Sequence, residues 1–132
     1  MSLFACRTRS RVVLVLALAA LLQPACEELP NIPPTATFIF SPVSPIVAGS
    51  TSVVFNASGS TDSDGRIVSY VWDFGDGSPA QTGDGPVATH VFPDRPSTCI
   101  QFVYAVLLTV VDDKGDRATA SQNVSVAENC PR

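Results

Sequence analysis

The chain has little of what an enzyme active site or a nucleic-acid surface requires. It contains one histidine, His90, so a site that needs two histidine ligands cannot form. No serine stands in a Gly-x-Ser-x-Gly turn, which removes one signature of a serine nucleophile. Its 8 basic residues are outnumbered by 12 acidic ones, whereas nucleic acids and anionic membrane surfaces bind clusters of lysine and arginine. The sequence therefore predicts no catalytic residues and no nucleic-acid partner.

An apolar run of membrane-spanning length is also lacking. The residues from Val12 to Leu22 are all apolar and follow a segment with three arginines. As a helix they would extend about 16 Å, whereas the hydrocarbon core of a bilayer is about 30 Å thick. A basic segment followed by a short apolar one is typical of an export signal, so we predict a signal peptide over residues 1–25.

A cysteine, Cys26, follows shortly after this apolar run. The tract Leu21-Leu22-Gln23-Pro24-Ala25-Cys26 resembles the processing site of bacterial lipoproteins, where the cysteine is lipidated and becomes the new N-terminus. The resemblance implies that residues 26–33 are a lipidated N-terminus and linker, and that only the lipid contacts the membrane. Gln23 and Pro24 depart from the lipoprotein pattern, which leaves a soluble secreted or periplasmic protein as the alternative. Cleavage before Cys26 would keep five basic and twelve acidic residues, a formal charge of −7.

Short alternating runs of apolar residues dominate the chain from Asn31 onward, separated by glycine, proline and aspartate. This pattern is typical of an all-β sandwich, and no helix is expected. The two-residue period places Tyr70, Trp72 and Phe74 on one face of a strand. Strands are expected at residues 35–40, 51–57, 67–74, 102–111 and 117–126.

The tract from Val68 to Gly77, VSYVWDFGDG, joins a β-type run to a turn of aromatic, acidic and glycine residues. It resembles the central motif of the polycystic kidney disease (PKD) domain, and residues 31–34, 57–65 and 109–115 match other parts of that family in order. The resemblance implies an immunoglobulin-like antiparallel β-sandwich of about seven strands over residues 34–132. The family uses this fold mostly as an extracellular spacer or binding module. The core motif here is Trp72, Asp73, Phe74, Gly75, Asp76 and Gly77.

Within this motif, Trp72 is the only tryptophan, and we interpret it as a core anchor rather than a sugar-binding platform. Asp73 and Asp76 are interpreted as turn residues whose carboxylates accept hydrogen bonds from free backbone amides, while the glycines supply the unusual dihedral angles. His90 falls at a His-x-aromatic strand position of the family, which implies a structural role.

The last two strands are expected to form a hairpin around an aspartate-rich turn, with Val110 facing Ala118. The outward side of the first of these strands carries Ala105, Leu107 and Val111, which is more apolar than we expect for a surface that faces water. Contact with a partner is one interpretation. The other is that isolated apolar side chains on a sheet surface are ordinary.

Two cysteines lie in the predicted domain, Cys99 and Cys130. The hairpin register places Cys130 opposite Thr98, one residue away from Cys99. A single bulge between residues 95 and 102 would bring the two sulfurs together, and disulfides persist where exported chains reside. We therefore predict a Cys99–Cys130 disulfide. If Cys26 is not lipidated, it is an odd cysteine that could cross-link two chains.

Aspartates gather in two of the expected loops, and oxygen donors of this kind suit Ca²⁺. Some PKD-like domains bind calcium through the linker asparagine and loop aspartates, so the resemblance implies a candidate calcium site. By position its residues are Asn31, Asp62, Asp64, Asp112 and Asp113. The alternative is that each aspartate bonds its own turn and faces water.

Together these observations predict an exported, non-catalytic module of the bacterial cell envelope that contacts an extracellular protein or a polysaccharide. The alternative function is a calcium-stabilised structural spacer or a subunit of a surface assembly. Calcium is the one cofactor that either interpretation includes, and the negative charge makes soluble cations or basic surfaces better partners than anionic ones.

Overall fold

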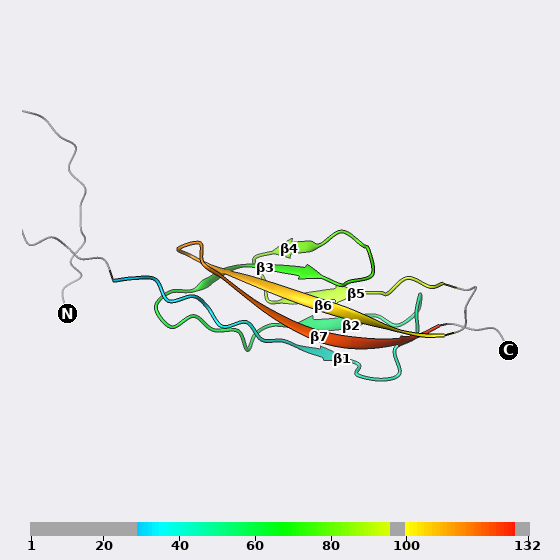
Figure 1. Cartoon of the computed structure of the whole chain (residues 1–132). Helices are drawn as coiled ribbons and strands as arrows, with labels where there is room; N and C mark the ends of the chain where they lie inside the picture. The colour runs from blue at the N-terminus through cyan, green and yellow to red at the C-terminus, as the bar shows by residue number, and fades with distance from the viewer. Residues whose placement is uncertain (1–28, 96–99, 129–132) are drawn as a thin grey trace, which may run out of the picture.

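Two antiparallel β-sheets packed face to face make up the computed structural model of this chain, which describes residues 29–95 and 100–128 (Figure 1). One sheet has three strands in the order β1-β2-β5, and the other has four in the order β4-β3-β6-β7. The described residues contain no helix, so the predicted all-β sandwich is confirmed. The strands are β1 (Ile39–Ser41), β2 (Val53–Asn56), β3 (Ile67–Asp73), β4 (Gln81–Gly83), β5 (Val87–His90), β6 (Gln101–Asp112) and β7 (Arg117–Ala127).

Three predicted features lie outside the described residues. They are the signal peptide over residues 1–25, the lipidation of Cys26 and the Cys99–Cys130 disulfide. All three stay predictions. Within the described part of the chain, no helix has both the length and the apolar character needed to span a bilayer.

The core lies between the two sheets and is built around Trp72. Alternation along β2 turns Val53 and Phe55 inward with 0% exposure, while Val54 between them is 42% exposed. Trp72 on β3 is 2% exposed, and its ring lies 5.8 Å from that of Phe55 and 5.2 Å, edge-on, from that of Phe38. Such aromatic contacts stabilise a core beyond the area that they bury. Trp72 thus lies inside the core and not on the surface of the sandwich.

The hairpin of β6 and β7 runs along the length of the sandwich (Figure 1). Val110 pairs with Ala118, as predicted, and the same register continues unbroken to the pair of Gln101 and Ala127. Alternation fixes this register, because a slip of one residue would turn the buried row of β6 toward water. The connecting turn contains Gly115 at a φ of 99°, a conformation that favours glycine.

The strand expected over residues 35–40 is shorter in the structure, and β1 begins only near the end of that range. Ahead of β1, Thr35 forms an isolated bridge with Thr61. The Ser60 hydroxyl donates to the carbonyl of Thr37 at 2.9 Å and accepts from its amide at 3.0 Å. Side-chain hydrogen bonds of this kind satisfy the backbone in place of a ladder. The segment ahead of β1 therefore stays outside the sheet.

Sequence patterns do not predict β4 and β5, which have three and four residues and flank a glycine- and proline-containing turn. β4 pairs with β3, and β5 pairs with β2, so the chain crosses from one sheet to the other between them. The crossing brings His90, at the end of β5, to the turn that follows β3, where its ring nitrogen contacts Asp76.

Candidate functional site

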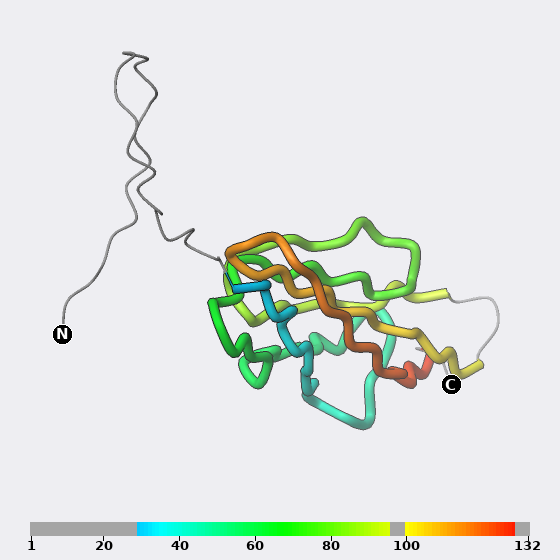
Figure 2. The backbone as a smooth tube through the Cα atoms, turned by 60° about the vertical axis from the view of Figure 1, so that its left-hand side comes forward, coloured from blue at the N-terminus to red at the C-terminus, as the bar shows by residue number. Residues whose placement is uncertain are grey.

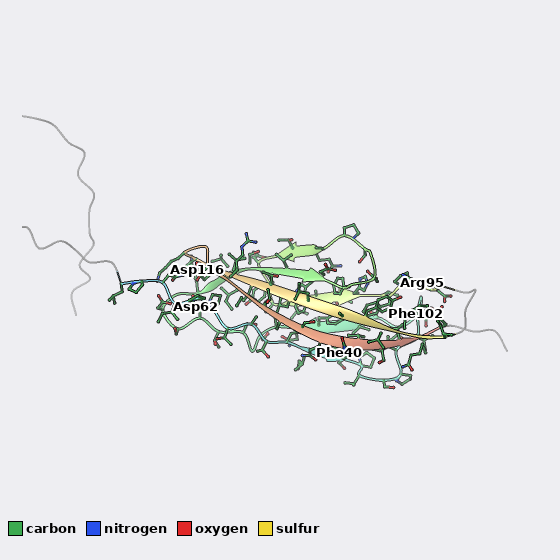
Figure 3. All side chains as sticks on the ribbon, viewed as in Figure 1. Phe40, Asp62, Arg95, Phe102 and Asp116 are labelled. Carbon is green, nitrogen blue, oxygen red and sulfur yellow. The ribbon has the colours of Figure 1, made fainter. Side chains whose placement is uncertain are left out.

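Three segments far apart in the sequence meet at one end of the sandwich: the start of the described chain, the β2–β3 loop and the β6–β7 turn (Figure 2). Figure 3 shows Asp62 and Asp116 at this end, away from Arg95 and Phe102 at the other. We call it the acidic end. Its charged and amide residues are Asn31, Asp62, Asp64, Arg66, Asp112, Asp113, Lys114 and Asp116.

Asp112 organises the β6–β7 turn from a buried position, with 1% exposure. Its Oδ1 accepts hydrogen bonds from the amides of Lys114 at 2.9 Å and Asp116 at 2.8 Å. The side-chain amide of Asn31 donates to Asp112 Oδ2 at 2.7 Å and to Asp116 Oδ2 at 2.8 Å. Burial opposes ionisation of Asp112, but the bonds from Asn31 and the turn amides outweigh it and hold the pKa of this carboxyl below its ordinary value of 3.8.

An ion pair joins the β6–β7 turn to the β2–β3 loop. Lys114 Nζ lies 2.6 Å from Asp64 Oδ2, and the amide of Ile32 donates to the same carboxylate at 3.3 Å. The hydrogen bond from Lys114 is the main cause that lowers the pKa of Asp64. The same bond raises the pKa of the ammonium, and the negative charges of Asp113 and Asp62 add to that effect. Both partners are partly exposed, so the pair contributes little to stability.

Two oxygens of the acidic end, Asn31 Oδ1 and Asp62 Oδ2, are buried without a hydrogen-bond donor among the described residues. Gly65 lies against two carboxylates, because a Cβ at this position would come within 2.5 Å of Asp113 Oδ1 and 2.7 Å of Asp62 Oδ2. The glycine therefore leaves a cradle of oxygens that a side chain would fill. A buried acceptor without a donor costs free energy, and a cation bound to it would remove that cost.

The acidic end is not a metal centre made of carboxylates alone. Among the described residues, no group of three or more histidine, cysteine, aspartate or glutamate side chains is arranged to hold an ion. Lys114 occupies one oxygen of Asp64, and backbone amides occupy one oxygen of Asp112. A cation at this end would therefore have to draw on the amide oxygen of Asn31 as well as on carboxylates.

The residues that the family resemblance implies as calcium ligands do lie together at this end of the sandwich. That set lacks Asp116, which shares the amide of Asn31 with Asp112. The spacing of Asp112 and Asp116 could have indicated this contact. Residues four apart that face each other across a tight turn direct their side chains to the same side of the hairpin. The pairing of Lys114 with Asp64 was also missed, since a side-chain contact between two loops leaves no pattern in the sequence.

A second polar cluster joins the core-motif turn to β5. Asp73 and Asp76 each accept a hydrogen bond from the amide two residues later, at 2.9 Å, in agreement with their interpretation as turn residues. Asp76 also accepts from the Ser78 hydroxyl at 2.6 Å and lies 2.7 Å from His90 Nε2. Burial opposes ionisation of Asp76, but the bonds from Ser78 and His90 together hold its pKa below the ordinary value of 3.8.

The imidazole of His90 is enclosed by its neighbours. Its ring stacks on Phe74 with 3.9 Å between centroids and meets Phe92 edge-on at 4.9 Å. The side chains of His90 and Asp76 are 11% and 1% exposed. A general base must come within hydrogen-bond reach of a substrate, which this arrangement does not offer. The geometry instead agrees with a structural role, in which His90 holds the motif turn against β5.

On the outer face of the four-stranded sheet, an apolar row on β6 lies beside a polar row on β7. We call the surface formed by these two rows the β6–β7 face. On β6, Val103 is 60% exposed and Leu107 is 39% exposed, with Ala105 exposed between them. Of the apolar row expected from the sequence, Ala105 and Leu107 are open to water, whereas Val111 is partly buried. Val103, which was not expected, is exposed in line with them. The β7 residues that pair with this row are Ser125, Asn123 and Ser121.

A comparison with protein families identifies the chain. The family model for the PKD domain matches residues 31–126, which is more than half of the sequence and includes the acidic end and the motif turn. The chain belongs to the PKD domain family. The resemblance carried by the VSYVWDFGDG tract is thereby confirmed, and the two polar clusters described above are features of a PKD domain.

Curated relatives match this PKD domain over a small part of their own length. The pre-pro-metalloprotease PrtV of Vibrio cholerae serotype O1 (strain M66-2) is 44% identical over 73 residues, which are 55% of this chain and 7% of that protein. The collagenase ColQ1 of Bacillus cereus (strain Q1) is 42% identical over 76 residues, which are 58% of this chain and 7% of that protein. The chain therefore spans less than a tenth of the length of these relatives.

Solved structures show the same fold. The PKD1 domain from the Vibrio cholerae metalloprotease PrtV superposes with a TM-score of 0.54 at 38% identity, covering 73% of this chain and 99% of that one. A structure described as the basis for the promiscuous specificity of carbohydrate-binding modules from the β-sandwich superfamily gives a TM-score of 0.66 at 37% identity, covering 76% of this chain and 37% of that one. The PKD domain thus shares its sandwich with experimentally determined relatives.

Proposed function

We propose that this PKD domain is a non-catalytic module of the cell envelope that contacts an extracellular protein or a polysaccharide. The observation that carries the proposal is the β6–β7 face. Its exposed apolar row is typical of a contact surface, and the hydroxyl and amide groups beside it can bond to peptide groups or to sugar hydroxyls. Relatives named as a collagenase and as carbohydrate-binding modules support these two classes of partner.

Catalysis is not part of this proposal. His90 is the only histidine of the chain, and Phe74, Phe92 and Asp76 enclose it. A serine or a water molecule acting as nucleophile needs a base that can reach the substrate. An enclosed imidazole does not meet that need, so we assign no reaction to the domain.

Co-sedimentation with insoluble polymers tests the β6–β7 face. The mature protein, expressed from the full chain, is mixed with insoluble collagen, cellulose or chitin, and the bound fraction is measured. We expect at least one polymer to retain the wild type. We expect the variant with both Val103→Lys and Leu107→Lys to lose that binding, because two charges would have to be desolvated on contact.

The matched control changes the opposite face of the sandwich. Ile39 and Val54 are 70% and 42% exposed on the outer side of the three-stranded sheet, and their double lysine variant should bind as the wild type does. Equal loss in both variants would show that added charge alone weakens binding. Failure of all three polymers to retain the wild type would reject the proposal.

We further propose that the domain is held at the envelope by a lipid on Cys26 after removal of residues 1–25. The support for this is the sequence, in which the cysteine comes shortly after a basic and apolar export signal. Mass spectrometry of the mature N-terminus tests it. A diacylglyceryl group on Cys26 is expected, whereas an unmodified terminus would indicate the secreted or periplasmic alternative.

A second candidate function is a calcium-stabilised spacer, and the unpartnered oxygens of the acidic end favour it. No described residue donates a hydrogen bond to Asn31 Oδ1 or Asp62 Oδ2, and Gly65 lets the carboxylates of Asp62 and Asp113 approach each other. These donors fit Ca²⁺, which takes about 6 to 8 oxygen ligands. Asn31, Asp62, Asp64 and Asp113 would hold the ion, and the negative charges of Asp112 and Asp116 lie beside them. When bound, calcium would cross-link the entry segment to the β2–β3 loop and the β6–β7 turn.

Calcium titration followed by thermal melting tests this candidate. The melting temperature of the wild type should rise with calcium concentration, because a ligand that binds only the folded state stabilises it. Gly65→Ala should reduce the rise, since its Cβ would push two carboxylates apart. Gly85→Ala is the matched control, because a Cβ there meets no atom within 4 Å. A flat response of the wild type would remove the candidate.

A further inference from the structure

Lys114 places its ammonium group beside a candidate metal ligand. Its Nζ lies 2.6 Å from Asp64 Oδ2 and 3.4 Å from the carbonyl oxygen of Asp64. Calcium binds carboxylate oxygens at about 2.3 to 2.6 Å. The ammonium therefore approaches this oxygen about as closely as a bound calcium ion would.

We propose that Lys114 is a tethered competitor of the divalent cation, so that its displacement from Asp64 sets how tightly the acidic end binds calcium. The proposal rests on the calcium candidate described above. It adds Lys114, whose role would be to lower the calcium affinity of the site and not to bind the ion.

The lysine side chain can leave its partner without disturbing the turn. The side chains of Lys114 and Asp64 are 43% and 27% exposed, so the ammonium can move into water at small cost. The backbone at this position stays fixed, because the amide of Lys114 donates to the buried Asp112 at 2.9 Å. The oxygens of the acidic end thus keep their places whether the ammonium is at Asp64 or in solvent.

Charge decides how strong the competition is. Repulsion between a unit charge and a divalent ion about 4 Å apart in water corresponds to roughly a thirtyfold change in affinity. Salt and the mobility of an exposed lysine reduce this value, so removal of the ammonium should tighten calcium binding roughly tenfold. Lys114→Met removes the charge and keeps most of the length of the side chain.

Arg66 provides a matched comparison at the same end. Its Nε lies 4.0 Å from Asp113 Oδ2, and its side chain is 79% exposed. Arg66→Met changes the net charge by the same amount as Lys114→Met but leaves the oxygen of Asp64 covered. We expect it to tighten calcium binding less than about threefold, because its charge is screened by solvent.

Isothermal titration with calcium chloride alone measures the affinities of the wild type, Lys114→Met and Arg66→Met. All three are made as the mature protein from the full chain, and circular dichroism verifies that each is folded. A double variant, Lys114→Met with Asp62→Asn, reports whether the ion binds at the acidic end. We expect Lys114→Met to bind roughly tenfold more tightly than the wild type, and the added Asp62→Asn to abolish that gain.

Each other outcome has a defined meaning. Equal affinities for the wild type and Lys114→Met would overturn the competitor role while keeping the calcium candidate. Equal tightening by Arg66→Met would overturn it too, because net charge alone would explain the gain. If the gain in calcium affinity persists in the double variant with Asp62→Asn, the ion binds away from the acidic end, and the competitor role is overturned. Binding by Lys114→Met alone would support it strongly, and no binding by either protein would reject the inference together with the calcium candidate.

Discussion

Removing the side chain of His90 tests how firmly the motif turn is held against β5. His90→Ala deletes the 2.7 Å contact between Nε2 and Asp76 Oδ2 and the ring that stacks on Phe74 at 3.9 Å. A hydrogen bond to a charged group contributes about 1.5 to 3 kcal/mol, and an aromatic pair contributes about 0.5 to 1.5 kcal/mol. Asp76 keeps its two bonds from Ser78, which limits the loss. The free energy of unfolding should therefore fall by about 2 to 4 kcal/mol.

Further variants separate the two contributions. His90→Phe keeps a ring against Phe74 and loses the hydrogen bond, whereas His90→Gln keeps a donor and loses the ring. Urea unfolding gives the stability of each variant. A double-mutant cycle of His90→Phe with Asp76→Asn isolates the coupling between the two side chains, which we expect to reach at least about 1 kcal/mol.

An exposed neighbour serves as the control. Thr89 faces water on the same strand, and Thr89→Ala should change stability by less than about 0.5 kcal/mol. A loss below about 1 kcal/mol for His90→Ala would refute the reasoning, because it would lie under the range for a single charged hydrogen bond. A coupling of zero in the cycle would refute it independently.

The remaining predictions concern the pH dependence of stability, the packing of the core and the predicted disulfide. The pKa values of Asp76 and Asp112 lie below the ordinary 3.8 in the folded state. Their ionised carboxylates therefore contribute fully to the free energy of unfolding above about pH 4, and this contribution is lost as the pH falls through the folded pKa values. Urea unfolding between about pH 2 and 6 should show the decline, and a pH-independent stability would contradict it. Trp72→Ala should cost about 3 to 5 kcal/mol, measured by the same unfolding assay. Peptide mapping without reduction should find Cys99 linked to Cys130, and reduction should lower stability by about 3 to 4 kcal/mol; two free thiols would exclude the bridge.

Much of the four-stranded sheet could be predicted because its long strands carry a strict period. In the β6–β7 hairpin, one register alone buries the inward row, so Val110 and Ala118 had to face each other. β4 and β5 could not be found in this way, because β4 is exposed throughout and β5 buries only Ala88, so neither carries an alternating apolar pattern. β1 was placed too early because the sequence does not show that Ser60 bonds to the backbone ahead of it.

At the acidic end, residue types and family positions predicted that the asparagine and four of the aspartates meet, but not that Lys114 and Asp116 join them. The sharing of Asn31 between Asp112 and Asp116 depends on side-chain geometry within a folded turn. The contact between His90 and Asp76 spans 14 residues and two sheets. Such pairings follow only after the strands have been ordered, because the crossing from β4 to β5 brings them together.

The β6–β7 hairpin has a mechanical consequence. The two ends of the described chain lie at opposite ends of the sandwich (Figure 1). A pull between them would act along the axis of β7, which is paired with β6 through eleven successive residues. Bonds loaded in shear have to rupture as a group, whereas bonds that are unzipped rupture one after another. We therefore expect the domain to resist stretching along its own length.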